Sequence, residues 1–366
     1  MSISTCLLSL VFAFILSGRL IHLESANAQN STSTDFSAIA KKIKKTYDQN
    51  LFKLEPRVQG HYAVRMWRIT ADSAYLNSIL FHYLALKEQF ADWANNLDSE
   101  QFRLSFADSL LSEKFKTAKG KIRKQLLEKR KEFVFASELL ETAYQIHTLG
   151  MDKAQLASQF QKVRNYLGSL DFKGFLLDSQ IVRYYAPQAV NYIFYLKFLG
   201  VADLEKEFGE IFKQVFRDEL DSKLSEIEYE NKIYGLTHFI IAASDYYQNY
   251  PPPQKYAWIL DYFECSAEKI MARSKPDVIA EVGLCFKLCG KKEDRVVTLT
   301  QQKILQAFDP KQGLIPPQKG KANLNKSEHR NVLAYLLLMD FERLYPGPDL
   351  LKFPQLNFLE RDDSQD

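Results

Sequence analysis

Apolar residues recur every three or four positions along most of the chain, which is the spacing of one face of an α-helix. Asn-Gly or Asp-Gly turns between alternating runs, which would indicate β-hairpins, do not stand out. Six segments are unusually apolar for helices. They begin near Arg57, Ala136, Pro187, Lys232, Pro276 and Glu328. The pattern predicts an all-α protein.

More polar, amphipathic segments alternate with the apolar ones, as in residues 202–224 and 254–272. Four of the five intervals between the starts of the apolar segments measure 44–52 residues, the length of one helical hairpin. Apolar helices need cover on most sides, whereas amphipathic helices keep one wet face, so we expect an inner and an outer layer. The sequence predicts a six-hairpin α/α-toroid; an open α-solenoid of helical hairpins is the alternative.

The N-terminal region has the features of an export signal. Residues 6–17 form an apolar run too short to span a bilayer, and an Ala-x-Ala pattern ends at Ala28. We expect a signal peptide over 1–28, cleaved after Ala28, and a periplasmic or secreted protein with no stable membrane insertion after cleavage. Because no Lys or Arg precedes the run, an uncleaved anchor is the alternative. We expect a disordered leader over 29–34, one domain over 35–350 and a polar tail over 351–366.

The first interval between apolar segments is the longest, and it holds a basic insertion around residues 72–132. We expect a solvated helix pair there; a basic patch for anionic lipid or polysaccharide is the alternative. The 48 Lys and Arg nearly balance 45 Asp and Glu, so the net charge of +3 gives no indication of nucleic-acid binding. With 46% hydrophobic residues the chain is not intrinsically disordered.

Three cysteines follow the expected signal: Cys265, Cys285 and Cys289. An odd number argues against a full disulfide framework. Cys265 can bridge to one of the other two across a helix pair, or the thiols stay free and buried. We predict no metal site and no cofactor. A site made by His61, His238 and His329 across helices is the metal-binding alternative.

Polar residues interrupt the apolar helices mainly in their first two turns. They are His61 and Arg65 in the first, Gln188 and Asn191 in the third, Tyr234, Thr237 and His238 in the fourth, Asp277 and Glu281 in the fifth, and Glu328, His329 and Asn331 in the sixth. In a ring of parallel inner helices these turns lie at one end. The side chains are therefore expected to converge on one cavity, where helix N-termini favour anions.

Glu281 is the strongest candidate, because it lies in an apolar run where a carboxylate needs a partner or a raised pKa. Its alternative is a structural ion pair with Arg65 or Arg330. Asp277 and Glu328 each match a helix-capping pattern, which is the simpler interpretation for both. For His238 the default is a hydrogen-bonded core histidine.

Four segments resemble a bacterial family catalogued as domain of unknown function 3541: HYAVRMWR (61–68), YGLTHFIIAASDYYQ (234–248), KPDVIAEVGLCFKLCG (275–290) and SEHRNVLAYLLL (327–338). The resemblance covers most of the chain from about His61 onward. It implies a bacterial exported protein and supplies no catalytic residue. The alternation of helices also resembles the toroids of glycoside hydrolases, polysaccharide lyases and lanthionine-type cyclases, at the level of fold alone.

Two functions follow as hypotheses. In the first, the protein is a hydrolase or lyase that acts on a glycan or cell-envelope polymer by carboxylate acid–base chemistry. The expected catalytic residues are Glu281, His238 and Asp277, and the expected substrate-binding residues are His61, Arg65, Asn191, Tyr234 and His329. In the second, the protein is a non-catalytic binding or scaffold module of the envelope.

Overall fold

The computed structural model describes residues 36–153, 155–317 and 323–353. Helices make up nearly all regular structure in these ranges, which contain no strand and one isolated bridge between Asp309 and Leu314. The predicted signal peptide, leader and most of the tail lie outside the described residues. None of the described helices is long and apolar enough to cross a membrane.

Six helices form an inner layer, one for each apolar segment of the sequence. They are α2 (Pro56–Thr70), α6 (Lys131–Thr148), α9 (Ser179–Phe198), α11 (Glu226–Ala243), α13 (Pro276–Leu288) and α15 (Leu324–Leu338). In α13 every residue from Val278 to Leu288 is buried. Burial on all sides explains why the polar face of an ordinary surface helix is missing from this sequence.

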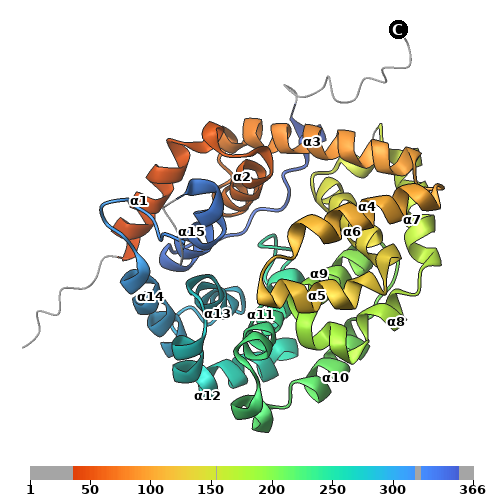
Figure 1. The fold of residues 1–366 in the computed structure, drawn as a ribbon. Coiled ribbons are helices and arrows are strands. Elements are labelled where there is room, and N and C mark those ends of the chain that lie inside the picture. Colours follow the sequence, from red (N-terminus) through yellow and green to blue (C-terminus); the bar gives the residue numbers. More distant parts are fainter. Residues whose placement is uncertain (1–35, 154, 318–322, 354–366) are drawn as a thin grey trace, which may run out of the picture. The chain divides into compact units, whose positions relative to one another are not determined.

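The remaining helices are α1 (Phe36–Asp48), α3 (Leu76–Asn95), α4 (Glu100–Lys114), α5 (Ala118–Glu128), α7 (Ala157–Ser169), α8 (Phe172–Leu176), α10 (Glu205–Val215), α12 (Ala257–Arg273) and α14 (Arg295–Ala307). They pack on the inner layer; most of them surround it, whereas α4 and α5 cross in front of α6 and α9 in Figure 1. Each inner helix packs on outer partners, for example α2 on α3 and α13 on α14. One apolar core joins the two layers.

Inner helices that are consecutive in sequence pack together from α6 through α9, α11 and α13 to α15, and α15 also packs on α2. The outer helix α3 contacts both α2 and α6. The prediction of an all-α protein is confirmed. The choice between toroid and open solenoid stays a prediction.

Four inner helices, α6, α9, α11 and α15, begin four to eight residues earlier than the sequence suggested. For α9 and α11 the reason is that their capping residues lie in polar stretches. Ser225 and Glu228 form a capping box that starts α11 at Glu226, and Asp178 caps α9 through the backbone N–H groups of Gln180 and Ile181. His238 and Thr237 therefore lie in the second half of α11, and Asn191 lies in the second half of α9, so the expectation that they occupy the first two turns is wrong. The argument from helix N-termini does not apply to His238.

A kink divides α9 where the sequence analysis placed the start of its apolar helix. Tyr185 has non-helical backbone angles, and Pro187 cannot donate to the carbonyl of Arg183. The side chain of Asn231 donates to that carbonyl instead, at 3.2 Å, and Arg123 donates to the next one, of Tyr184, at 2.8 Å. The kink is therefore stabilised by side chains from α11 and α5.

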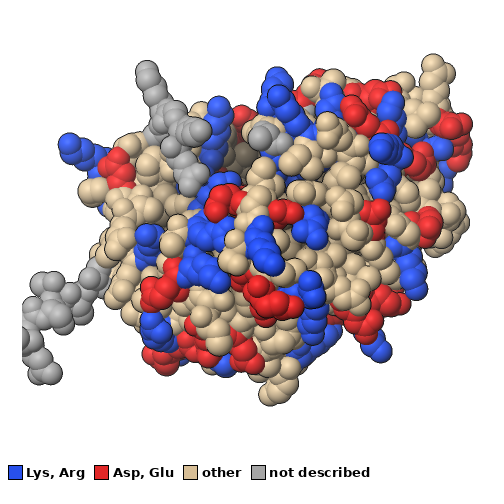
Figure 2. Space-filling model, turned by 60° about the horizontal axis from the view of Figure 1, so that its bottom comes forward, with Lys and Arg blue, Asp and Glu red and all other residues tan. Residues whose placement is uncertain are grey.

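The basic insertion is built into the fold. Within it, α3 is the outer partner of α2, α4 packs on α6, and α5 packs on α9. The guanidinium of Arg123 lies over the ring of Tyr185, 4.9 Å from its centroid. The face drawn in Figure 2 carries interspersed basic and acidic side chains and a hollow with Lys and Arg beside it.

Candidate functional site

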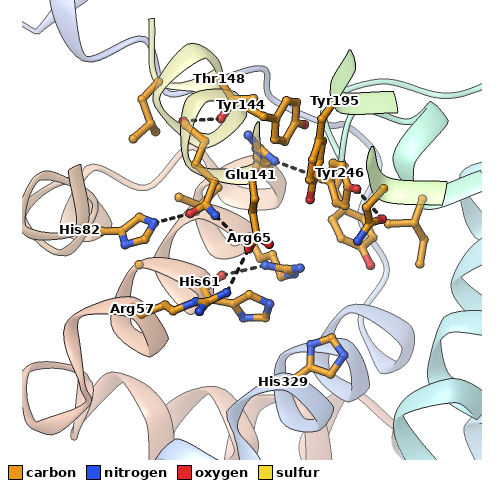
Figure 3. Close-up of a pocket in the computed structure, with 18 of the residues that line it drawn as sticks. Arg57, His61, Arg65, His82, Glu141, Tyr144, Thr148, Tyr195, Tyr246 and His329 are labelled. Carbon is orange, nitrogen blue, oxygen red and sulfur yellow. Dashed lines mark hydrogen bonds and ion pairs between the residues drawn. The ribbon is translucent and has the colours of Figure 1, made fainter. Parts of the chain in front are cut away.

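A pocket of about 280 Å³ lies among the inner helices. All six inner helices contribute lining residues, and the segment after α11 adds Tyr246 and Tyr247. Arg57, His61 and Arg65 project from α2 toward it, and His329 reaches it from α15 (Figure 3).

The pocket brings together most of the site residues that were predicted from the sequence. Its wall contains His61, Arg65, Asn191, His238, Glu281 and His329. Tyr234 lies behind this wall, where its hydroxyl is 2.9 Å from Nε2 of His329. Asp277 is not among the lining residues; its buried Oδ1 has no hydrogen-bond partner among the residues described.

Asn191 joins an imidazole to a phenol. Its Oδ1 lies 2.7 Å from Nδ1 of His238 and 2.6 Å from the hydroxyl of Tyr246, which donates to it. Burial and the charge of Arg65 lower the pKa of His238 to about 3, so its ring is neutral at neutral pH. Burial raises the pKa of Tyr246 well above its usual value, so the phenol keeps its proton. The pair thus offers one proton acceptor and one proton donor.

Glu281 lies between two histidines at the base of the pocket. Thr237 donates to its Oε2 at 2.6 Å, while Nε2 of His238 and Nε2 of His329 each lie 3.8 Å from one of its oxygens. Burial raises the pKa of Glu281 well above its usual range, although the Thr237 hydrogen bond lowers it. Arg330 donates to the carbonyl of Pro316 instead. Burial therefore favours the protonated form of Glu281, and the ion pair with Arg65 or Arg330 that was the alternative is not among the contacts of the described residues.

A second carboxyl–imidazole pair lies between α2 and α15. Nδ1 of His61 is 2.7 Å from Oε2 of Glu328, and the rings of His61 and His329 are 5.3 Å apart. Burial raises the pKa of Glu328 to about 8 and lowers that of His61 well below its usual value. Burial and neighbouring His61 likewise lower the pKa of His329. The raised pKa of Glu328 and the lowered pKa of His61 both favour a neutral His61–Glu328 pair.

Arginines supply the positive charge of the pocket. Arg57 pairs with Glu141 at 3.0 Å. Arg65 donates from Nη1 to the carbonyl of His61 at 3.2 Å and lies 5.9 Å from the ring centroid of Tyr247, and its buried Nε has no hydrogen-bond partner among the described residues. Arg65 thus places a guanidinium in the wall of a pocket whose histidines are neutral, which suits an anionic group.

A strained turn places the tyrosines. Asp245, Tyr246 and Tyr247 have φ values of 51°, 53° and 73°, in the left-handed region that side chains disfavour. Buried Arg68 holds the turn by donating to the carbonyl of Tyr246 at 2.9 Å and, from Nε, to that of Gly347 at 3.0 Å. Strain of this kind persists only where surrounding contacts over-determine it, and it concentrates at functional sites.

The turn has two further supports. The hydroxyl of Tyr144 donates to Oδ1 of Asp245, and the Tyr144 ring stacks on that of Tyr195 at 4.1 Å and 18°. Gln248 accepts from the backbone N–H of Gly347 at 2.7 Å. The segment at Gly347 is itself fixed to α2, because the backbone N–H of Tyr345 donates to the carbonyl of Arg68.

The family described as Domain of unknown function (DUF3541) matches residues 36–359. The chain belongs to this family. No match was found among curated proteins or among solved structures. The resemblance noted from four short segments is thus confirmed over the whole described part of the DUF3541 chain.

Two capping expectations for this DUF3541 chain are wrong. α13 starts after Lys275 without a side-chain cap, so Asp277 does not cap it. α15 is capped by Asn323, which accepts from the backbone N–H of Lys326, and Glu328 lies a turn further in, buried against His61. Glu328 is therefore a site residue that a match to a capping pattern concealed.

Several pocket residues were not predicted for different reasons. Arg57 and Arg68 share a helix face with His61 and Arg65, at spacings of four, four and three residues, so this periodicity was a usable signal. Glu141 and Tyr144 share a face of α6 with Gln145 and Thr148, so the same signal was present there. Tyr246 carries no such signal, because its position depends on the turn after α11. Among the described residues, no group of three or more His, Cys, Asp or Glu side chains is arranged to hold a metal ion.

The three cysteines of the DUF3541 domain are free. Cys285 and Cys289 are buried and Cys265 is exposed. Of the two interpretations of the sequence, unbridged thiols therefore hold in this structure, with Cys265 at the surface instead of in the core.

Proposed function

We propose that this DUF3541 chain is an exported enzyme, a hydrolase or lyase that cleaves a glycan or another cell-envelope polymer in the pocket. One observation carries the proposal: Asn191 holds the neutral imidazole of His238 and the protonated phenol of Tyr246 at 2.7 and 2.6 Å. A proton acceptor and a proton donor fixed by one amide are what acid–base cleavage requires. Arg65 would bind an anionic part of the substrate.

Glu281 would act through His238. Its protonated carboxyl is 3.8 Å from Nε2 of His238 and on the side away from Asn191. It would therefore position the imidazole of His238. In its protonated form it would add no negative charge, which would otherwise raise the pKa of His238. This role differs from the direct acid–base role that the sequence suggested, and it predicts a smaller loss on substitution.

Export is supported by the apolar run over 6–17 and the Ala-x-Ala pattern ending at Ala28. A bacterial cell that produces the full chain, followed by N-terminal sequencing of the protein outside the cytoplasm, would test it. A new N-terminus at Gln29 is expected. An intact Met1 on a membrane-bound protein would favour the uncleaved anchor.

Activity is tested with the mature protein, residues 29–366, on a panel of envelope polymers with products read by mass spectrometry. We expect His238→Gln to lose at least about 100-fold of the rate, the usual contribution of a general base. Glu281→Gln keeps an acceptor for Thr237 and should lose about tenfold, as positioning partners do. The control is His147→Gln, because His147 pairs with Asp152 outside the pocket wall.

The second candidate is a glycan-binding module, favoured by the stacked rings of Tyr144 and Tyr195 in the pocket wall. Folded wild-type protein that binds a polymer and releases no product would establish it and exclude the enzyme. Equal rates for wild type and His238→Gln would remove His238 from the mechanism.

A further inference from the structure

The pocket distinguishes between the two ways of breaking a glycosidic bond. Hydrolysis in most glycosidases uses two carboxyl groups that flank the bond, one of them ionised as nucleophile or base. Here Glu281 is 2% exposed behind two histidines, where burial raises its pKa and disfavours the ionised form, and Glu141 is engaged with Arg57 at 3.0 Å. An ionised carboxylate that is free to face a substrate is not what this wall offers.

The same wall fits β-elimination. This reaction removes the proton next to a carboxylate and expels the oxygen on the following carbon, so it needs a neutral base, a proton donor and a cation that stabilises the enolate-like intermediate. His238, Tyr246 and Arg65 are these three groups, and all three line the pocket. The amide of Asn191 accepts from the first two through Oδ1, which leaves its Nδ2 donor for a substrate carboxylate.

We propose, on the basis of the function above, that the substrate is a polymer containing uronic acid and that the pocket cleaves it as a lyase. Arg65 and the Nδ2 group of Asn191 bind the uronate carboxylate. His238 takes the proton from C5, the C4–O bond breaks as the C4=C5 double bond forms, and Tyr246 gives its proton to the departing oxygen. The proton on His238 then returns to Tyr246 through solvent, so the reaction consumes no water and no oxidant.

Incorporation of oxygen from water into the products separates elimination from hydrolysis, and so separates this proposal from the broader one. The mature protein is incubated with alginate, polygalacturonate, hyaluronan and chondroitin, each in heavy-oxygen water and beside a carboxyl-reduced sample of the same polymer. We expect products from at least one polymer that absorb ultraviolet light through the new double bond and contain no heavy oxygen. The carboxyl-reduced samples should stay intact, because elimination needs the acidic C5 proton.

Substitutions test the roles proposed for Arg65 and Tyr246. Arg65→Met should raise KM and lower kcat by at least about 100-fold in total, with partial recovery in Arg65→Lys, since an anion-binding and transition-state role requires the charge. Tyr246→Phe should lose a similar factor while keeping the ring contacts with Tyr144 and Tyr195. The control is Arg343→Met, because exposed Arg343 also lies over a tyrosine ring, 5.0 Å from that of Tyr345, outside the pocket.

Each outcome decides between the proposals. Saturated products that carry heavy oxygen would overturn the lyase and leave the polymer-cleaving enzyme in place, as would cleavage of carboxyl-reduced or neutral polymers. Stable folded protein that cleaves none of these polymers or the envelope panel would overturn both. Wild-type kinetics in Arg65→Met would overturn the assigned carboxylate site.

Discussion

Helix α11 carries two polar groups less than two turns apart, a buried lysine and a histidine that is 14% exposed to the pocket, and their surroundings differ in kind. Lys232 is 1% exposed and meets Asp218 at 2.6 Å and Asp221 at 2.7 Å, with Tyr262 donating to Asp221 at 2.7 Å. His238 meets neutral partners and a pocket. In the Lys232 cluster charge is compensated by charge; in the His238 cluster burial removes the charge and leaves proton donors and acceptors. The first arrangement stabilises a fold, and the second suits proton transfer.

The largest expected effect is on stability, when Lys232 is replaced. Replacing it by Met leaves Asp221, which is 3% exposed, with Lys269 at 3.7 Å in place of Lys232 at 2.7 Å. We expect the free energy of unfolding to fall by about 4 kcal/mol, because a buried carboxylate that loses its shortest ion pair is costly even with Lys269 nearby. Urea denaturation followed by tryptophan fluorescence measures the loss, and the kinetics of the folded fraction should not change. Lys223→Met is the control, since Lys223 is exposed. A loss below about 1 kcal/mol would show that the cluster is not structural.

The stability of the protein in acid tests whether the pocket histidines are neutral. His82 serves for this test, because it also lines the pocket and donates to Gln145 at 2.9 Å. Burial lowers its pKa from 6.5 to about 4. The folded state therefore binds fewer protons than the unfolded state between these values. His82 contributes stability that is present above pH 6.5 and lost as the pH falls to 4, by about 3 kcal/mol in total.

The check is urea denaturation of wild type and His82→Gln at several pH values from 7 to 4. The variant should lose stability less steeply as the pH falls, because its side chain does not titrate. Parallel curves for the two proteins would show that His82 is not held neutral by burial.

The smallest effect concerns the packing that brings His82 to the wall. A methyl group on Gly60 of α2 would lie 2.1 Å from Cγ of His82, so one of the two must move. We expect Gly60→Ala to cost about 2 kcal/mol of stability and to reduce activity. Gly209→Ala is the matched control, because a methyl group there meets nothing within 4 Å in α10, and it should stabilise by about 1 kcal/mol. Equal effects of the two changes would remove the packing argument.

Helical periodicity was enough to predict the six inner helices, because a helix that is buried all round must be apolar all round. It also identified His61, Arg65, Glu281 and His329 as candidate site residues, since each is a polar residue in such an apolar helix. It could not predict Tyr246, which reaches Asn191 through a left-handed turn that no residue in Asp245–Tyr247 favours. Contacts from Arg68 of α2, from Tyr144 of α6 and from Gly347 hold that backbone, and such contacts are not visible in local sequence.

Capping patterns misled for a related physical reason. Asp277 and Glu328 stand close to helix starts in the sequence, as capping residues do, but both lie inside their helices. A local pattern cannot distinguish a carboxyl that meets its own backbone from one that meets a histidine on another helix. The starts of α9 and α11 show the converse, because their capping residues Asp178 and Ser225 lie in polar stretches ahead of the apolar ones.

The hydrogen bond between Arg68 and Gly347 also sets an order in time. Translation completes all six inner helices before residue 347 is made, and until then Arg68 cannot reach that carbonyl and Gln248 has no N–H to accept from. The turn with Tyr246 would therefore reach its final shape after the rest of the pocket. A chain cut between α15 and Gly347 would lose these hydrogen bonds, so the pocket reaches its final form only after residue 347 has been made.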